Sequence, residues 1–481
     1  MCVFVSNSSK MDAGVGIGGR SKSVVSMTTS RLDRKSPQVV EQGLKKKHVE
    51  ILQTNSNITV EKAKIDFNMT ASPDKWCDLS SAMLHGKMGI EVKPKDSAEW
   101  VSVNKYKKED KLPQMPEWGL VNNFYHSLFT NCIVSVNNHE VGDTGAQAYP
   151  YLTYLQTLLS TSVANSKSPA LKEIGFFKDN LRIDANDTIN ATATTPYWKR
   201  KQRFIDNKMV DFHIPLQSDL MNMEKLLPPN VKLSFRLHRN EDRFLFWNKT
   251  VENEFRIVLE DLKISLNMYE VHPAVLEDYR KDFANLPTNK KPPEQKFKFV
   301  QNELKSFAVP DQQMVLRHYD LFNSQHLPDK VYVAVVEQQA FNGMSTKNSF
   351  NFQMSNMQRA YLTVNQDMVP NPPYEYNLSD NQNMAYRTFL ENTGTAPFEL
   401  DTVDISNEEW KQNFCVYAFD RSPSLDNGLY NHHPTSGKMH LTIEMRSPTD
   451  KNFMVLVMAC YDKALVLDED KAYVESLIPP Q

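Results

Sequence analysis

The sequence predicts an all-β protein that contains two copies of one sandwich-like unit. Three observations support this prediction. Short runs of alternating apolar and polar residues recur along the chain, helix-like stretches are few and short, and a seven-residue turn motif occurs twice. The chain has 481 residues, which is too long for one ordinary core, so two or three domains are expected.

The N-terminal segment 1–47 has the composition of a flexible basic arm. It holds nine Lys or Arg and three acidic residues, a net charge of +6, so the remaining chain carries −9 when the total is −3. The segment is rich in Ser and Gly and poor in aromatics, and it buries too little surface to offset its ordering entropy. Loose contact with nucleic acid or another acidic surface is one interpretation, and a solvated tail without a partner is the other. The candidate contact residues are Arg31, Arg34, Lys35, Lys45, Lys46 and Lys47.

Period-two alternation predicts half-buried strands from residue 48 onward. The clearest alternating runs lie within 57–70, 230–237 and 438–445, and the continuous apolar runs 331–336 and 453–460 suit strands covered on both faces. Helices are expected only at 149–159 and 272–283, and the polar stretches 161–203 and 421–437 read as long loops. Many strands with few helices indicate a sandwich, a barrel or a jelly roll.

The turn motif marks an internal repeat. SVNNHEV at 135–141 returns as TVNQDMV at 363–369, which places Asn137 and Asn365 at the same point of a tight turn. Each copy is followed by a helix-like stretch, which starts near Tyr151 in the first and near Tyr386 in the second. The strand and charged loop at 232–244 likewise have a counterpart at 440–453.

This repeat predicts a duplicated β-domain. We expect a first unit at 48–272, a linker at 273–296 and a second unit at 297–481, because 287–296 is rich in Pro and Lys. A separate tight turn is predicted at Asn342 and Gly343, most simply as a plain hairpin.

Several stretches resemble the major capsid proteins of Polinton/Maverick elements, adintoviruses and related virophage-like viruses, in the adenovirus hexon-type lineage. They include VNNFYHSLFTNCIVSVNNHEV with YPYLTYLQTLLS, PLQSDLMNMEKLLPPNVKLSFRL, VVEQQAFNGMSTKNSFNFQ and FCVYAFDRSP. The resemblance runs from about residue 50 to about residue 470. It implies a double jelly roll, that is, two eight-stranded sandwiches in tandem with a few short helices and long loops.

The resemblance also implies a function and partners. Three copies would form a pseudo-hexagonal capsomer, and capsomers would tile an icosahedral shell around double-stranded DNA together with minor or penton capsid proteins. Such a protein would be located in the virion capsid and assembled inside the host cell rather than secreted. The basic arm would then lie on the inner side of the shell, where it would contact the packaged DNA by charge or lock neighbouring capsomers.

Chemical motifs point away from catalysis. The five cysteines are far apart with no CxxC, which argues against a disulfide framework or a zinc knuckle and fits a reducing compartment. No G-x-S-x-G or H-E-x-x-H occurs, and no apolar run of about 18 residues predicts a membrane span. We therefore expect a structural protein with no enzyme activity, cofactor or metal. The alternative function is a non-viral or domesticated β-sandwich that binds glycans, because fold alone does not fix function.

Overall fold

The computed structural model describes 44–54, 63–69, 72–94, 99–105, 118–179, 196–248, 254–274, 276–277, 295–324, 326–353, 357–375, 384–393, 403–421, 435–468 and 471–476. Antiparallel sheets dominate these residues. Most of the predicted linker 273–296 and most of the predicted loop 421–437 lie outside them.

The first half of the chain forms two large antiparallel sheets. One has the order β1-β11-β3-β4, with β8 also paired to β3, and the other has the order β2-β9-β6-β7. A small sheet pairs β5 with β10. The strands are β1 (Leu44–Gln53), β2 (Lys64–Met69), β3 (Lys75–Lys93), β4 (Val101–Ser102), β5 (Trp118–Leu120), β6 (Phe129–Val136), β7 (His139–Val141), β8 (Val210–Pro215), β9 (Leu233–Arg239), β10 (Phe246–Asn248) and β11 (Glu254–Val271).

The second half repeats this arrangement. One sheet has the order β12-β19-β14-β17, with β20 also paired to β19, and the other has the order β13-β18-β15-β16. The strands are β12 (Gln295–Val309), β13 (Val315–Ser324), β14 (Lys330–Glu337), β15 (Met357–Val364), β16 (Asp367–Glu375), β17 (Val416–Asp420), β18 (Gly437–Met445), β19 (Phe453–Asp468) and β20 (Lys471–Ser476).

The two halves share one topology, strand for strand. The order β2-β9-β6-β7 corresponds to β13-β18-β15-β16, and β1-β11-β3 with β8 corresponds to β12-β19-β14 with β17. The strands shared by both halves make an eight-stranded jelly roll of two four-stranded sheets in each, to which β4 adds a fifth strand in the first half and β20 a fifth strand in the second. The predicted all-β double jelly roll is confirmed. The domain boundaries at 47/48, 272/273 and 296/297 stay predictions, although β1 already begins at Leu44.

Alternating side chains explain why these segments are strands. On β2 and β9 the buried residues face one another in register, with Phe67 opposite Phe235 and Ile65 opposite Leu237. A shift of one residue would turn both apolar sets to solvent, so burial fixes the register. Five aromatic residues that could serve as core or as subunit contacts are buried within the chain: Trp118, Phe124, Phe129, Phe350 and Phe352.

Helices are short and lie mainly in the connections. The predicted helix at 149–159 is confirmed as α4. Of the predicted helix at 272–283 the structure describes 272–274 and 276–277, and all of these residues except His272 are helical. The helices are α3 (Phe124–Ser127), α4 (Ala148–Ser160), α5 (Pro169–Glu173), α6 (Pro196–Asp206), α7 (Asp242–Leu245), α9 (Gln338–Phe341), α10 (Met384–Asn392), α11 (Asn407–Gln412) and the 3-10 turn η1 (Asp219–Asn222).

The prediction of a plain loop at 161–203 was wrong where the structure describes it, because α5 and most of α6 lie there.

Arg200 anchors α6 with a side chain that is fully buried. Its Nη1 lies 2.8 Å from Asp179 Oδ1, and its Nε donates to the Leu120 carbonyl at 2.8 Å. Burial raises the pKa of Asp179, and the guanidinium opposes that shift. A paired and hydrogen-bonded charge of this kind is what makes burial of an arginine tolerable.

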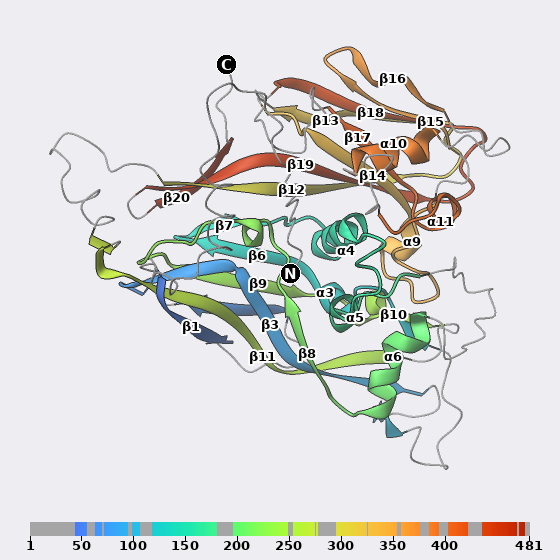
Figure 1. Cartoon of the computed structure of the whole chain (residues 1–481). Helices are drawn as coiled ribbons and strands as arrows, with labels where there is room; N and C mark the ends of the chain where they lie inside the picture. The colour runs from blue at the N-terminus through green and yellow to red at the C-terminus, as the bar shows by residue number, and fades with distance from the viewer. Residues whose placement is uncertain are drawn as a thin grey trace, which may run out of the picture.

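The four large sheets are stacked as layers (Figure 1). Below lies the sheet of β1, β11, β3 and β8, followed by the β6, β7 and β9 layer, then β12, β19 and β14, and finally β13, β18, β15 and β16 at the top. The two middle layers face each other across a junction that is filled by α4 and neighbouring segments.

Candidate functional site

Asn137 and Asn365 occupy equivalent turns in the two halves. Asn137 joins β6 to β7 and Asn365 joins β15 to β16, with left-handed φ angles of 46° and 49°. Asn137 Oδ1 accepts from Lys232 N at 2.9 Å, and its own N donates to the Lys232 carbonyl at 2.9 Å. Asn365 makes the same two bonds with Lys438, at 3.0 and 3.1 Å. Asparagine suits this place because it tolerates left-handed backbone and supplies an acceptor to the neighbouring strand.

Asn342 and Gly343 form a turn, but the prediction of a plain hairpin was wrong. The pair ends α9, with Asn342 as the C-cap and Gly343 at a φ of 76°. Gly343 N donates to Ala340 O at 3.0 Å and Met344 N to Gln339 O at 2.9 Å, the two bonds of a Schellman motif. The asparagine-glycine pair therefore satisfies the end of a helix instead of joining two strands.

Tyr151 and Tyr386 follow the equivalent turns in α4 and α10, yet their surroundings differ. Tyr151 is fully buried, its hydroxyl donates to the Ser349 carbonyl at 2.9 Å, and its ring stacks on Phe341 at 5.5 Å. Tyr386 is half-buried and donates to the Ile405 carbonyl at 2.6 Å. Helix α4 thus reaches into the second half of the chain, whereas α10 stays within its own half.

Aromatic stacking fills the centre of this junction between the halves. Tyr154 of α4 stacks on Phe350 with centroids 4.2 Å apart, and Phe244 meets Phe350 edge to face at 6.0 Å. All three side chains are buried. One continuous cluster of buried apolar residues includes members of both halves, so the junction belongs to the core.

Two aspartates of the first half bind β12 of the second. Asp143 Oδ2 accepts from Leu304 N at 2.6 Å, and Asp219 Oδ1 accepts from Asn302 Nδ2 at 3.0 Å. Asn302 Oδ1 in turn accepts from Cys460 Sγ at 3.2 Å. Burial raises the pKa of Asp219 to about 7, and the nearby Asp143 adds to the shift while the Asn302 bonds oppose it. Asp219 is thus a buried titratable group in the seam between the jelly rolls.

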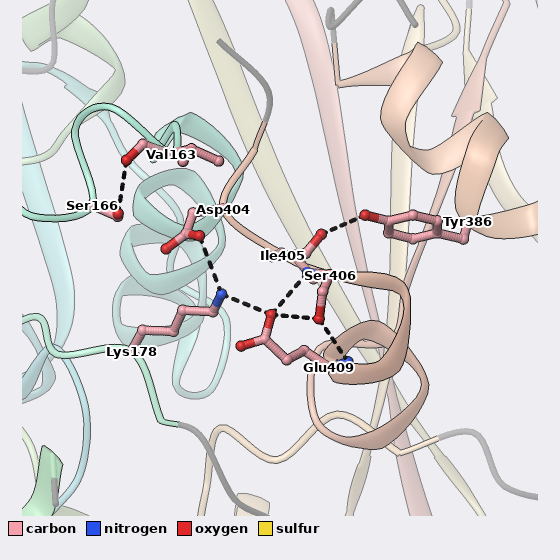
Figure 2. Close-up of polar contacts among 8 residues, drawn as sticks. All are labelled: Val163, Ser166, Lys178, Tyr386, Asp404, Ile405, Ser406 and Glu409. Carbon is pink, nitrogen blue, oxygen red and sulfur yellow. Dashed lines mark hydrogen bonds and ion pairs between the residues drawn. The ribbon is translucent and has the colours of Figure 1, made fainter. Parts of the chain in front are cut away.

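A lysine clasp joins the halves at a second point (Figure 2). Lys178 Nζ lies 2.9 Å from Glu409 Oε2 and 3.6 Å from Asp404 Oδ1. Burial opposes ionisation of Glu409, but hydrogen bonds from Ser406 and Lys178 lower its pKa overall. Beside the clasp, Asp404 N donates to the Thr161 carbonyl at 3.0 Å. A backbone hydrogen bond and the ion pairs of Lys178 therefore join the two halves at the same point.

The predicted basic contact residues are only partly described. Lys45, Lys46 and Lys47 lie in β1, where Lys46 pairs with Glu270 and Lys47 with Tyr269 of β11. They therefore form part of a sheet rather than of a free arm, and Lys45 lies at the register shift between Leu44 and Lys46. Lys46 and Lys47 are exposed. Arg31, Arg34 and Lys35 lie outside the described residues.

Within the residues that the structure describes, no group of three His, Cys, Asp or Glu side chains is placed to hold a metal ion. None of the helices described is long and apolar enough to cross a membrane. The features that the structure does show are the exposed lysines of β1 and the junction between the two halves of the chain. The junction was not predicted from the sequence, because the residues that form its hydrogen bonds lie more than 80 positions apart along the chain.

Comparison with known proteins finds one distant relative and several solved structures of similar fold. No family model matches the chain. An uncharacterized protein of Caenorhabditis elegans, F54H12.2, is 20% identical over 355 residues, which cover 72% of this chain and 79% of that protein.

Three solved viral structures match nearly the whole chain. The cryo-EM structure of the Sputnik virophage matches with a TM-score of 0.57 and 12% identity, over 93% of this chain and 92% of that chain. The Faustovirus major capsid protein matches with a TM-score of 0.53 and 8% identity, over 93% and 97%. The mavirus major capsid protein matches with a TM-score of 0.51 and 12% identity, over 94% of each chain. The structural neighbours are thus viral double jelly-roll capsid proteins, and at these identities the likeness concerns the fold.

Proposed function

We propose that this chain is a structural major capsid protein. The observation that supports the proposal best is that the repeated jelly-roll topology and the match to three viral structures both extend over nearly the entire chain. A binding module grafted onto a sandwich would need only one such unit. The sequence motifs assign it to the Polinton/Maverick, adintovirus and virophage-like group, and a relative encoded by a nematode fits an element carried in an animal genome.

In this proposal the chain forms homotrimers that act as capsomers. Capsomers contact each other and minor or penton proteins to build an icosahedral shell around double-stranded DNA, and the chain's place is the virion capsid after assembly inside the host cell. Its role is structural rather than enzymatic. The linker at 273–296 would join the two jelly rolls.

The N-terminal basic residues are the proposed contact to DNA or to neighbouring capsomers. The net charge of +6 over residues 1–47 includes Arg31, Arg34 and Lys35 ahead of β1, and Lys46 and Lys47 extend the charge onto an exposed sheet edge. Flexible basic chains bind phosphate charge without reading bases, so the contact should weaken as salt rises.

Electron microscopy with mass measurement tests the proposal. The purified chain should have three times its monomer mass of 55.4 kDa and should show pseudo-hexagonal particles or shells. A protein that stays monomeric at micromolar concentration and binds a glycan array would instead favour the domesticated glycan binder.

Deletion of residues 1–43 tests the arm separately and leaves β1 intact. The trimer should persist, while assembly or DNA retention should fall, and the difference from the full chain should depend on salt. Equal assembly and DNA retention at every salt concentration would show that the arm is a passive tail.

A further inference from the structure

Two histidines lie side by side on the outer sheet of the first half. His85 of β3 and His213 of β8 are direct register partners in an antiparallel pair of strands. Their imidazole rings stack with centroids 3.8 Å apart and an interplanar angle of 23°. Among the described strands β8 pairs only with β3, so it is an edge strand of this sheet, which forms the lowest layer in Figure 1. The histidine pair therefore spans the line along which the edge strand is attached.

Both rings lie on the solvent side of the sheet. Phe212 and Ile214, the neighbours of His213 in β8, are buried, so His213 points to the opposite side, and it is exposed. His85 lies on the same side of β3 and is half-buried. A hydrated ion can therefore reach both imidazoles from solvent.

A hydroxyl group orients the ring of His85. Its Nε2 lies 2.6 Å from Ser265 Oγ of β11. When Nε2–H donates to the hydroxyl oxygen, the lone pair of Nδ1 is left free to bind a metal ion. Metal-bound histidines typically donate their other ring N–H in this way, and the acceptor fixes the tautomer and the ring orientation. Burial lowers the pKa of His85, and the charges of His213 and Lys263 lower it further, which favours the neutral ring that a metal ion requires.

The charges that surround the pair cancel. Lys87 Nζ lies 3.3 Å from Asp261 Oδ2, so this lysine is already paired. Asp211 lies two positions before His213 on the same exposed side of β8, and its carboxylate offsets the charge of Lys263. Two lysines and two aspartates leave no net positive charge to repel an approaching metal ion.

We propose that His85 and His213 form a binding site for a divalent transition-metal ion that joins the edge strand β8 to β3. Imidazole nitrogens suit Cu²⁺, Zn²⁺ and Ni²⁺, and among these ions the affinity is highest for Cu²⁺. The ion takes Nδ1 of His85 and one ring nitrogen of His213, whose exposed ring turns out of the stack, and water fills the other positions. The site has two protein ligands and is thus smaller than the groups of three His, Cys, Asp or Glu that the described residues lack. It does not depend on the proposed capsid function.

Titration of the full chain with Cu²⁺, followed by electron paramagnetic resonance, tests the site. The unaltered chain should bind one Cu²⁺ ion more tightly than any further ion, with a spectrum that shows two imidazole nitrogens. His213→Gln removes one ligand at an exposed position and should weaken this binding about 100-fold, because the second contact to the ion is intramolecular. His318→Gln is the matched control, since the half-buried ring of His318 stacks on the phenyl ring of Phe307, with centroids 4.3 Å apart, instead of on a second imidazole. This control should bind Cu²⁺ like the unaltered chain.

Two further measurements separate metal binding from a purely structural role of the pair. Ser265→Ala removes the group that orients His85 and should weaken Cu²⁺ binding about 10-fold while the spectrum still shows two nitrogens. Amide hydrogen exchange within β8 should slow when Cu²⁺ is added to the unaltered chain but not when it is added to His213→Gln. Without metal, the thermal unfolding midpoints of these variants and the unaltered chain should nearly agree. A spectrum with a single imidazole nitrogen, or equal Cu²⁺ affinity of His213→Gln and the unaltered chain, would overturn the proposal.

Discussion

Replacement of Asp219 by Asn should make the chain more stable at neutral pH and leave it almost unchanged in acid. Asp219 is buried in the seam between the jelly rolls, where Asn302 Nδ2 donates to it, and an amide oxygen can accept the same bond. The substitution therefore removes the ionisation but keeps the size of the side chain and its partner.

The size of the effect follows from the pKa shift. Burial raises the pKa of Asp219 from 3.8 to about 7, with the nearby Asp143 adding to the shift. Between these values the folded chain holds a proton that the unfolded chain has released, so the free energy of unfolding falls as pH rises through this window. At about 1.4 kcal/mol per pKa unit the loss amounts to about 4 kcal/mol above pH 7. The Asn variant does not titrate and should avoid that loss.

Differential scanning calorimetry at pH 4 and pH 8 measures this difference. The variant should unfold about 4 °C higher than the unaltered chain at pH 8, and the two should nearly coincide at pH 4. Asp211→Asn, on the exposed face of β8, is the control and should shift neither midpoint. An Asp219→Asn gain of equal size at both pH values would refute the linkage argument.

Four other substitutions test the fold and the junction. Asn137→Ala and Asn365→Ala each remove a strand-to-turn hydrogen bond at positive φ and should lower stability by about 1–3 kcal/mol in thermal unfolding; unequal effects would argue against equivalent turns. Lys178→Met cuts the partly exposed clasp and should cost about 1 kcal/mol or less, while limited proteolysis near the junction becomes faster. Arg200→Met leaves Asp179 buried without its partner and should cost about 3–5 kcal/mol by denaturant titration, most of which Asp179→Leu should restore in the double variant.

The sequence predicted the strands well because the information is local. Alternation in the stretches that became β2, β9 and β18 reports one buried face, and a period of two has no other simple explanation. The paired asparagines at 137 and 365 were found for the same reason, since a left-handed turn accepts few residue types.

Elements held by distant partners were missed. Helix α6 lies in a stretch that reads as a polar loop, although Pro196 at its first position was an available signal. Nothing in the sequence marks Arg200 as a fully buried residue, because its partners Asp179 and Leu120 are 21 and 80 positions away. The junction bonds of Asp219 and Asp143 belong to this class as well.

The local meaning of a turn signal also depends on its surroundings. An asparagine-glycine pair favours left-handed backbone, and Gly343 does adopt it. Whether such a turn joins strands or ends a helix depends on the residues before it, and here the preceding QQAF forms α9. The composition of the pair could not decide between these outcomes.

The aromatic junction has a consequence for how this architecture is inherited. Because Tyr154 and Phe350 belong to one cluster shared by both jelly rolls, neither half would keep its packing if it were expressed alone. Separation would expose two large rings and leave the carboxyl group of Asp219 without Asn302. The duplicated halves have thereby become mutually dependent, and evolution can vary their outer loops independently but can delete neither one.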